Sequence, residues 1–161
     1  MVILQKKITK EKCVEQILLA EYQRYFRLAM SFVHNEADAG DIVQNGAYKA
    51  LKNSDKLKHT EYASTWIYRI MLNEIFRFCK MPKFASLETV EEAGYEDSYE
   101  NFDLQKALDG LSKEDKAVVA LRYFEDLKLE EISEILQENI STVKSRLYRS
   151  MKKLRIKLEE D

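Results

Sequence analysis

Proline and glycine are scarce in this chain, which has one proline and four glycines among its 161 residues. Both residues interrupt helices, so their scarcity favours long helical segments. Charged residues make up 34% of the chain and hydrophobic residues 45%, as expected of a soluble helical protein. We therefore predict an all-α fold.

Long apolar runs are also missing, since the longest extends only from Ala117 to Leu121. A membrane-spanning helix needs about 20 apolar residues. The opening MVIL is too brief for the apolar core of a signal peptide. We expect the protein to stay in the cytoplasm.

Cysteine and histidine are too few and too scattered to indicate a metal site or a disulfide framework. Cys13 and Cys79 lie in separate helical patterns without a CxxC motif, and we interpret both as small core residues. His34 and His59 are isolated, no Gly-rich phosphate loop occurs, and no carboxylate pair lies in an apolar setting. The sequence therefore argues against an enzyme and predicts no cofactor and no bound metal.

The segment 127–157 carries the strongest positive signal, because its last part is almost wholly basic outside one apolar stripe. No acid interrupts residues 142–158, although the whole chain has a net charge of −2. Such a helix repels itself and gains from binding phosphates, which predicts contact with DNA; a solvated basic face is the alternative. The predicted stripe, at steps of three and four residues, consists of Val143, Leu147, Met151, Leu154 and Leu158.

Two shorter segments before the basic helix complete a predicted helix-turn-helix. Ser112 and Asp115 form a capping box that opens a supporting helix reaching Phe124. The turn at 137–141 has no glycine, so we expect its left-handed residue to be Asn139 or Gln137. The packing face of the first helix of the motif consists of Leu129, Ile132, Ile135 and Leu136.

An acidic segment divides the chain into two parts. Residues 86–103 contain seven acids and neither Lys nor Arg, and they follow Pro82. No sustained helical periodicity runs through them, which is typical of a linker. We predict a helical domain at 1–83, a flexible acidic linker at 84–102 and a helix-turn-helix domain at 103–161.

The N-terminal part shows three helical patterns, near residues 12–33, 38–53 and 61–80. In the third pattern Trp66 shares a polar, basic side with Arg69, Asn73 and Arg77. Two interpretations of this tryptophan stay open: a core residue at the edge of a bundle, or a stacking platform for single-stranded bases.

Three motifs in order resemble bacterial sigma factors of the extracytoplasmic-function (ECF) group. Residues 38–44 (DAGDIVQ) resemble the segment of that family that binds core RNA polymerase. Residues 64–73 (STWIYRIMLN) resemble its promoter-melting helix. Residues 130–136 (EEISEIL) and 142–149 (TVKSRLYR) resemble its fourth-region helix-turn-helix. The resemblance covers nearly all of residues 15–157.

The resemblance implies an RNA polymerase sigma factor that directs core RNA polymerase to specific promoters. Implied contacts with the minus-thirty-five element are Thr142, Lys144, Ser145, Arg146, Tyr148, Arg149, Lys152 and Lys153. Among these, Arg146, Lys152 and Lys153 are expected to bind mainly the DNA backbone. Implied contacts with the minus-ten element are Lys56, Lys58, Tyr62, Trp66, Arg69, Asn73 and Arg77, beside the loop 54–60 that holds a flipped base. Implied contacts with core polymerase are Asp38, Asp41, Ile42, Gln44 and Asn45.

The family also implies a role in a stress response and an anti-sigma factor, often membrane-anchored, but no small-molecule substrate. Residues 124–133 are similar to cell-envelope-stress members of Gram-positive bacteria. Departures from the family pattern, which bear on the polymerase contacts and on the angle of the recognition helix, are Asn45, Ala47, Gln137 and Ser141. The alternative function is a two-domain helix-turn-helix regulator that binds duplex DNA without polymerase.

Overall fold

The computed structural model describes residues 2–81 and 99–160, and every regular element in these ranges is helical. This confirms the predicted all-α fold. Most of the predicted linker, residues 84–98, lies outside the described residues. Among the described helices, none is both long enough and apolar enough to span a bilayer.

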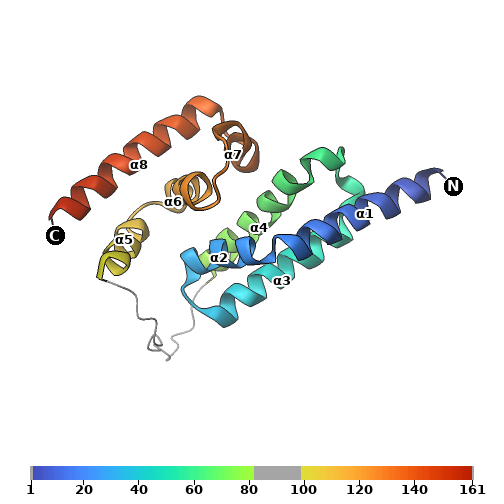
Figure 1. Ribbon diagram of the computed structural model, residues 1–161, viewed down its shortest axis with the longest axis horizontal. Coiled ribbons are helices and arrows are strands. Elements are labelled where there is room, and N and C mark those ends of the chain that lie inside the picture. Colours follow the sequence, from blue (N-terminus) through green and yellow to red (C-terminus); the bar gives the residue numbers. More distant parts are fainter. Residues whose placement is uncertain (1, 82–98, 161) are drawn as a thin grey trace.

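The N-terminal part is a bundle of four helices, shown in blue to green in Figure 1. Two 3₁₀ turns, Ser54–Lys56 and Thr60–Tyr62, connect the third helix to the fourth. The helices are α1 (Val2–Ala20), α2 (Tyr22–Val33), α3 (Glu36–Lys52) and α4 (Ala63–Lys80). The single helix predicted near 12–33 is wrong, because the chain breaks at Glu21 and helix extends back to Val2. Neither proline nor glycine marks this break in the sequence.

Local capping and one small residue set how α3 enters and packs in the bundle. His34 ends α2 in the left-handed conformation, and the Asn35 side chain accepts a hydrogen bond of 2.9 Å from the backbone N–H of Asp38. Gly46 faces α4, where an added Cβ would lie 2.5 Å from the Met71 sulfur. The absence of a side chain at Gly46 therefore permits the close approach of α3 and α4.

The C-terminal part contains four helices and one π-helical turn, Ala120–Phe124. The helices are α5 (Tyr99–Asp109), α6 (Lys113–Val119), α7 (Leu129–Leu136) and α8 (Ile140–Glu160). The serine half of the predicted capping box is confirmed, because Ser112 Oγ accepts a hydrogen bond of 3.2 Å from Asp115 N. The supporting helix is shorter than predicted, since its last turn becomes π-helical. Helix α5 begins at Tyr99, inside the range predicted as linker.

The turn between α7 and α8 has its left-handed residue at one of the two positions predicted, Asn139 and Gln137. Gln137 adopts the left-handed conformation, with φ 55° and ψ 45°. Two hydrogen bonds between Ser133 and Glu138 hold this turn: Glu138 N donates to Ser133 O at 3.1 Å, and Ser133 Oγ donates to Glu138 O at 2.5 Å. These bonds compensate for the cost of a left-handed residue with a side chain.

The inward stripe of α8 differs from the predicted one. Val143, Leu147 and Leu154 are buried as expected, but Met151 is 37% exposed and Leu158 is 41% exposed. Ser150 takes the inward position instead and is fully buried. Steps of four, three and four residues return to one side of a helix, so position 150 continues the stripe where position 151 leaves it. The predicted stripe is therefore wrong at Met151 and Leu158 and confirmed at Val143, Leu147 and Leu154.

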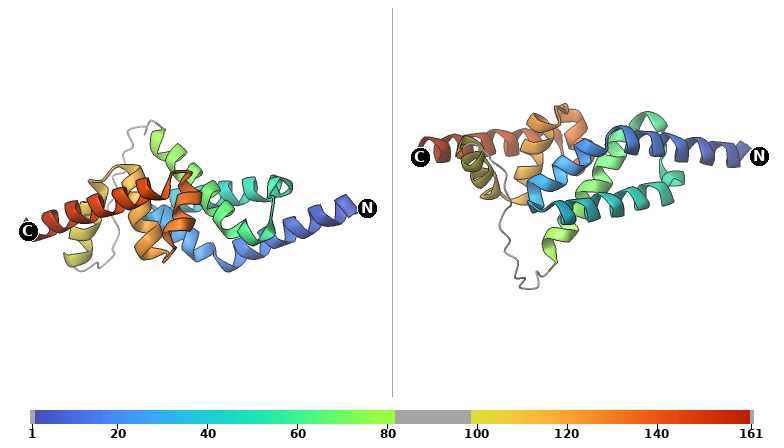
Figure 2. Two further views of the ribbon diagram at one scale, coloured as in Figure 1. Left: turned by 90° about the horizontal axis from the view of Figure 1, so that it is seen from above. Right: turned by 60° about the horizontal axis from the view of Figure 1, so that its bottom comes forward.

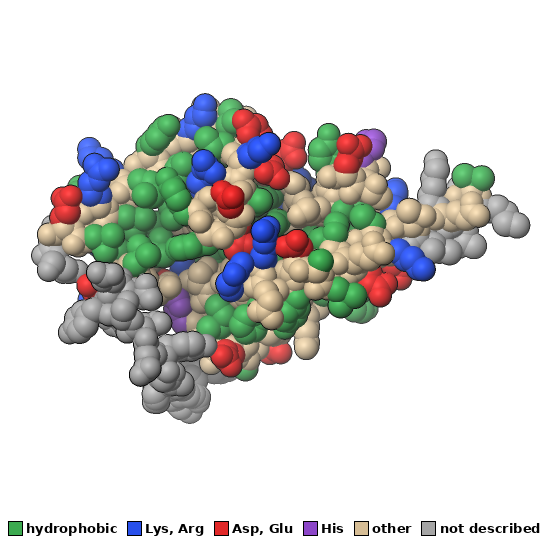
Figure 3. Space-filling model, viewed as in Figure 1, with side chains coloured by type: hydrophobic (Ala, Val, Ile, Leu, Met, Phe, Trp, Pro, Cys, Tyr) green, Lys and Arg blue, Asp and Glu red, His purple; other side chains and the backbone are tan. Residues whose placement is uncertain are grey.

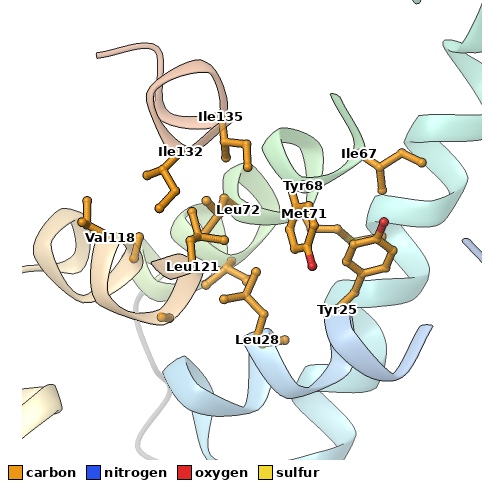
Figure 4. Close-up of a cluster of buried hydrophobic side chains, with 14 of the residues drawn as sticks. Tyr25, Leu28, Ile67, Tyr68, Met71, Leu72, Val118, Leu121, Ile132 and Ile135 are labelled. Atoms are coloured by element: carbon orange, nitrogen blue, oxygen red, sulfur yellow. The ribbon is translucent and has the colours of Figure 1, made fainter. Parts of the chain in front are cut away.

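The two parts share one continuous hydrophobic core. Figure 4 shows Leu72 of α4 beside Leu121, Ile132 and Ile135 of the C-terminal part, and all four side chains are buried. At this seam, Tyr68 OH donates a hydrogen bond of 2.7 Å to the buried carboxylate of Glu125. The termini point away from each other at opposite ends of the molecule (Figure 2).

A second set of polar contacts joins α2 to the C-terminal part. His34 Nε2 lies 3.0 Å from Asp109 Oδ2, and Lys116 Nζ lies 2.6 Å from Asp109 Oδ1. Lys116 also lies over the ring of Phe32, 4.6 Å from its centroid. Gln105 Nε2 donates to the Ser31 carbonyl at 3.3 Å. The relative position of the two parts is therefore fixed by side-chain contacts as well as by the shared core.

Candidate nucleic-acid interface

Helix α8 presents a long exposed basic face, anchored by its buried stripe. Tyr148 is 70% exposed, and the Arg149 side chain is 53% exposed. The other exposed members of the predicted DNA-binding set are Lys144, Ser145, Lys152 and Lys153, while Thr142 is half-buried. The structure thus brings the predicted recognition residues onto one helix and leaves most of them accessible.

Arg146 is placed differently from the other predicted DNA contacts. Its Nε and Nη2 atoms donate to the Glu138 carboxylate at 3.0 Å, and its Nη1 donates to Asp115 Oδ1 at 3.0 Å. Only 23% of its side chain is exposed. The hydrogen bonds that Arg146 donates to Glu138 raise the pKa of Arg146 above its ordinary value. This arginine joins α6, the α7–α8 turn and α8 within the protein.

The predicted minus-ten residues fall into two groups. Tyr62 is 52% exposed, and Lys56, Lys58, Asn73 and Arg77 are also exposed. Trp66 is half-buried and packs against the core at the edge of the bundle. Arg69 Nη2 donates to the Glu134 carbonyl of α7 at 3.2 Å. Trp66 and Arg69 therefore contact protein in this arrangement, whereas the first group faces solvent.

In the loop 54–60, which the family resemblance implies holds a flipped base, Ser54 and Leu57 are buried. The exposed residues of this loop are Asp55, Lys56, Lys58, His59 and Thr60. The buried pair fixes the loop against the bundle, so its polar surface has a defined position beside α4.

The predicted polymerase-binding residues lie on α3, mostly on its outer face. Asp41, Gln44 and Asn45 are exposed, and Asp38 is half-buried at the start of the helix. Ile42 is only 2% exposed and belongs to the core. The assignment of Ile42 to a surface contact is therefore corrected: its position in the DAGDIVQ motif places it on the inward side of α3, beside Val43.

Buried polar residues were not found by the apolar periodicity. Glu74 is 7% exposed and pairs with Lys49 Nζ at 2.6 Å. It lies seven residues after Ile67 and three after Met71, so the helical period itself marks this position as inward. Asp115 and Glu125 are buried as well; Asp115 was recognised only as part of a cap. Cys79 is exposed near the end of α4, so its interpretation as a core residue is wrong, while Cys13 is half-buried against the core.

A shallow apolar hollow lies between α5 and α8, where Figure 3 shows hydrophobic side chains gathered on the surface. Ala107, Leu111 and Ile156 line it, with Lys153 and Lys157 at its edge. Within residues 2–81 and 99–160, no group of three or more His, Cys, Asp or Glu side chains is arranged to hold a metal ion.

Comparison with known families gives two matches that together cover most of the chain. Residues 18–81 match the family described as sigma-70 region 2, and residues 101–154 match sigma-70, region 4. The first match contains α2, α3 and α4, and the second contains the helix-turn-helix and most of α8.

The chain is also similar over nearly its whole length to RNA polymerase sigma factors of similar length. RNA polymerase sigma factor SigV of Bacillus subtilis is 40% identical over 98% of this chain and 98% of its own. ECF RNA polymerase sigma factor SigW of the same organism is 26% identical over 98% of both chains. The fold is similar to that of sigma factor RpoE in complex with the anti-sigma factor NepR from Bartonella quintana, with a TM-score of 0.72, 24% identity and coverage of 91% and 97%. It is also similar to CnrH in complex with the cytosolic domain of CnrY, with a TM-score of 0.75, 20% identity and coverage of 96% and 97%.

Proposed function

The chain belongs to the ECF group of the sigma-70 family of RNA polymerase sigma factors, and we propose in detail how its surfaces direct core polymerase to promoters. It is a transcription initiation factor, and we propose that it has no catalytic activity of its own. Its α8 reads the minus-thirty-five element, α4 with the 3₁₀ turns reads and opens the minus-ten element, and the outer face of α3 binds core polymerase.

The observation that carries this proposal is the exposed face of α8. Lys144, Tyr148 and Arg149 project from a helix whose opposite side is fixed in the core. A helix of this kind fits the major groove, where arginine and lysine read guanine and a tyrosine ring contacts the groove wall. Lys152 and Lys153 continue the basic face toward the C-terminus, where they reach adjacent phosphates.

The acidic outer face of α3 has the opposite character. Asp41 is exposed beside Gln44 and Asn45, so this face suits a basic partner. We assign it to core polymerase. Because α3 and α8 belong to different parts of the chain, polymerase and the minus-thirty-five element bind separate surfaces.

We infer that the closed arrangement of the two parts does not hold both promoter elements at once. Two elements named for positions ten and thirty-five lie roughly 25 base pairs apart, or about 85 Å of duplex at 3.4 Å per base pair. Arg69 of the minus-ten set instead contacts α7 of the helix-turn-helix directly, at 3.2 Å. We infer that the seam between α4 and α7 opens when the protein binds polymerase and promoter.

Regulation is proposed from the relatives. The solved structures of RpoE and CnrH are complexes with NepR and CnrY, the first of which is named an anti-sigma factor. We propose that this protein also has an anti-sigma factor, that it acts in the cytoplasm, and that it serves a stress response.

Run-off transcription tests the proposed function. Purified core polymerase with this protein is expected to start transcription at a defined subset of genomic promoters, whereas core polymerase alone is not. Duplex DNA binding by the protein without polymerase, combined with no transcription in the reconstituted mixture, supports the regulator alternative and refutes the sigma assignment.

A further inference from the structure

Two arginines of α8 share one oxygen of a buried carboxylate. Asp115, in the first turn of α6, is only 4% exposed. Arg146 Nη1 lies 3.0 Å from Asp115 Oδ1, and Arg149 Nη2 lies 3.5 Å from the same atom. The Arg149 side chain is 53% exposed and that of Arg146 only 23%. The carboxylate thus has a near, sheltered partner and a more distant, exposed one.

The near partner satisfies a requirement that the fold imposes. A buried carboxylate is unfavourable unless a cation and hydrogen bonds compensate for the water it has lost. Arg146 supplies both, and its remaining nitrogens are fixed by Glu138 at 3.0 Å. Arg149, three residues later on the same helix, therefore does not have to neutralise Asp115 and keeps its guanidinium directed partly to solvent.

We propose that Arg146 is a positioning residue: it neutralises Asp115, so that Arg149 stays available to read DNA bases, and does not itself contact phosphate. The inference rests on the proposed function, because it takes α8 as the helix that reads the promoter. Without Arg146, the nearest cation to Asp115 is Arg149, whose Nη2 is already 3.5 Å away. Arg149 then turns inward to pair with the carboxylate and is lost to the major groove.

The competing explanation, a phosphate contact by Arg146, makes different predictions. Each phosphate contact contributes about 0.9 to the slope of log affinity against log salt concentration, whatever the sequence. A base contact contributes discrimination between sequences instead. Loss of a phosphate contact therefore flattens the salt dependence and preserves sequence preference. Loss of the positioning role instead lowers sequence preference and leaves the salt dependence unchanged.

The test uses full-length variants bound to core polymerase and a library of minus-thirty-five sequences, measured across salt. Arg146→Ala is expected to lower discrimination by about 5- to 150-fold at the base pair that Arg149 reads, as Arg149→Ala does, with an unchanged salt slope. Adding Asp115→Asn to Arg146→Ala removes the charge that captures Arg149, so the double variant regains sequence preference. Glu138→Gln is the matched control, because it weakens the other anchor of Arg146 but leaves Asp115 neutralised; sequence preference stays intact.

Asp115→Asn alone keeps the test decisive if Arg146→Ala does not fold, because it is nearly isosteric and removes the carboxylate directly. It is expected to retain sequence preference, and loss of preference in this variant overturns the proposal. A salt slope reduced by about one unit in Arg146→Ala with preference intact also overturns it, as does a double variant that stays indiscriminate. If the wild-type holoenzyme shows no sequence preference, the proposed function and the inference are refuted together. If the wild type shows a preference that Arg149→Ala lowers but Arg146→Ala does not, only the positioning role is refuted.

Discussion

The hydroxyl of Tyr68 is expected to hold the two parts of the protein together. Tyr68 belongs to α4, and its hydroxyl donates a 2.7 Å hydrogen bond to Glu125, which lies just after the π-helical turn of the C-terminal part. Both residues are almost fully buried, at 2% and 3% exposure. Burial and the hydrogen bond to Glu125 raise the pKa of Tyr68, so the hydroxyl remains a donor throughout the physiological range.

Tyr68→Phe removes this donor and leaves the rest of the ring. Hydrogen bonds to charged groups contribute about 1.5–3 kcal/mol, and a buried carboxylate that loses its partner costs at least as much. This range applies, not the larger values for unpaired buried charges, because Arg24 also interacts electrostatically with Glu125. The equilibrium constant for opening the seam is therefore expected to rise by about 10- to 150-fold, at 1.36 kcal/mol per factor of ten.

Hydrogen exchange of the α7 amides measures this opening, because α7 packs on α4 across the seam. Tyr68→Phe is expected to accelerate exchange in α7 by the same factor, with a much smaller effect in α3. Glu125→Gln is the matched control, since its amide oxygen still accepts from Tyr68 while the buried charge is removed, and its effect is expected to be smaller. Equal acceleration in α3 and α7, or none in α7, refutes the assignment of this hydroxyl to the seam.

Three further outcomes are expected. Asp41→Lys weakens core-polymerase binding in a pull-down without lowering the melting temperature, whereas Glu15→Lys, a charge reversal at another exposed acid on α1, leaves binding unchanged. Lys152→Ala lowers promoter affinity about evenly across sequences and flattens the salt slope by roughly one unit; a change in sequence preference contradicts a phosphate contact. Burial alone raises the pKa of Asp109, but Lys116 and His34 lower it below its ordinary value of 3.8. The ionised Asp109 therefore stabilises the folded protein fully above pH 3.8, and this contribution is lost as the pH falls further. Asp109→Asn is expected to remove this loss of unfolding free energy at acid pH, measured by urea unfolding across pH. An unchanged dependence of the unfolding free energy on pH contradicts the prediction.

The fold was predictable where one local signal decided the structure. The scarcity of proline and glycine indicated helices, Ser112 marked a helix start, and the absence of glycine between α7 and α8 narrowed the left-handed residue to two candidates, of which Gln137 is the one observed. Each of these features depends on residues within a few positions of one another. Sequence patterns were therefore enough to predict these features, apart from the choice between Asn139 and Gln137.

Features that depend on distant partners were not predictable in this way. In the sequence, Arg146 cannot be distinguished from the other basic residues of the run TVKSRLYR. Its environment differs because Asp115, 31 positions earlier, and Glu138 both bind its guanidinium. Ser150 is likewise an ordinary polar residue in the sequence, yet it occupies the buried stripe where Met151 was expected. Charge and hydropathy patterns treat each side chain by type, whereas burial is decided by the helix that packs against it.

The seam between the two parts shows how an apparently independent unit can depend on its neighbour. Ile132 and Ile135 were predicted as the packing face of the first helix of the motif, which needs only partners within the helix-turn-helix. In the structure they also meet Leu72 of α4 (Figure 4). Opening the seam therefore exposes apolar surface that the isolated helix-turn-helix cannot cover, at about 25 cal/mol per Å². If promoter binding opens the seam, as we propose, contacts with polymerase and DNA compensate for this cost, and a ligand that stabilises the seam opposes promoter recognition by the same free energy.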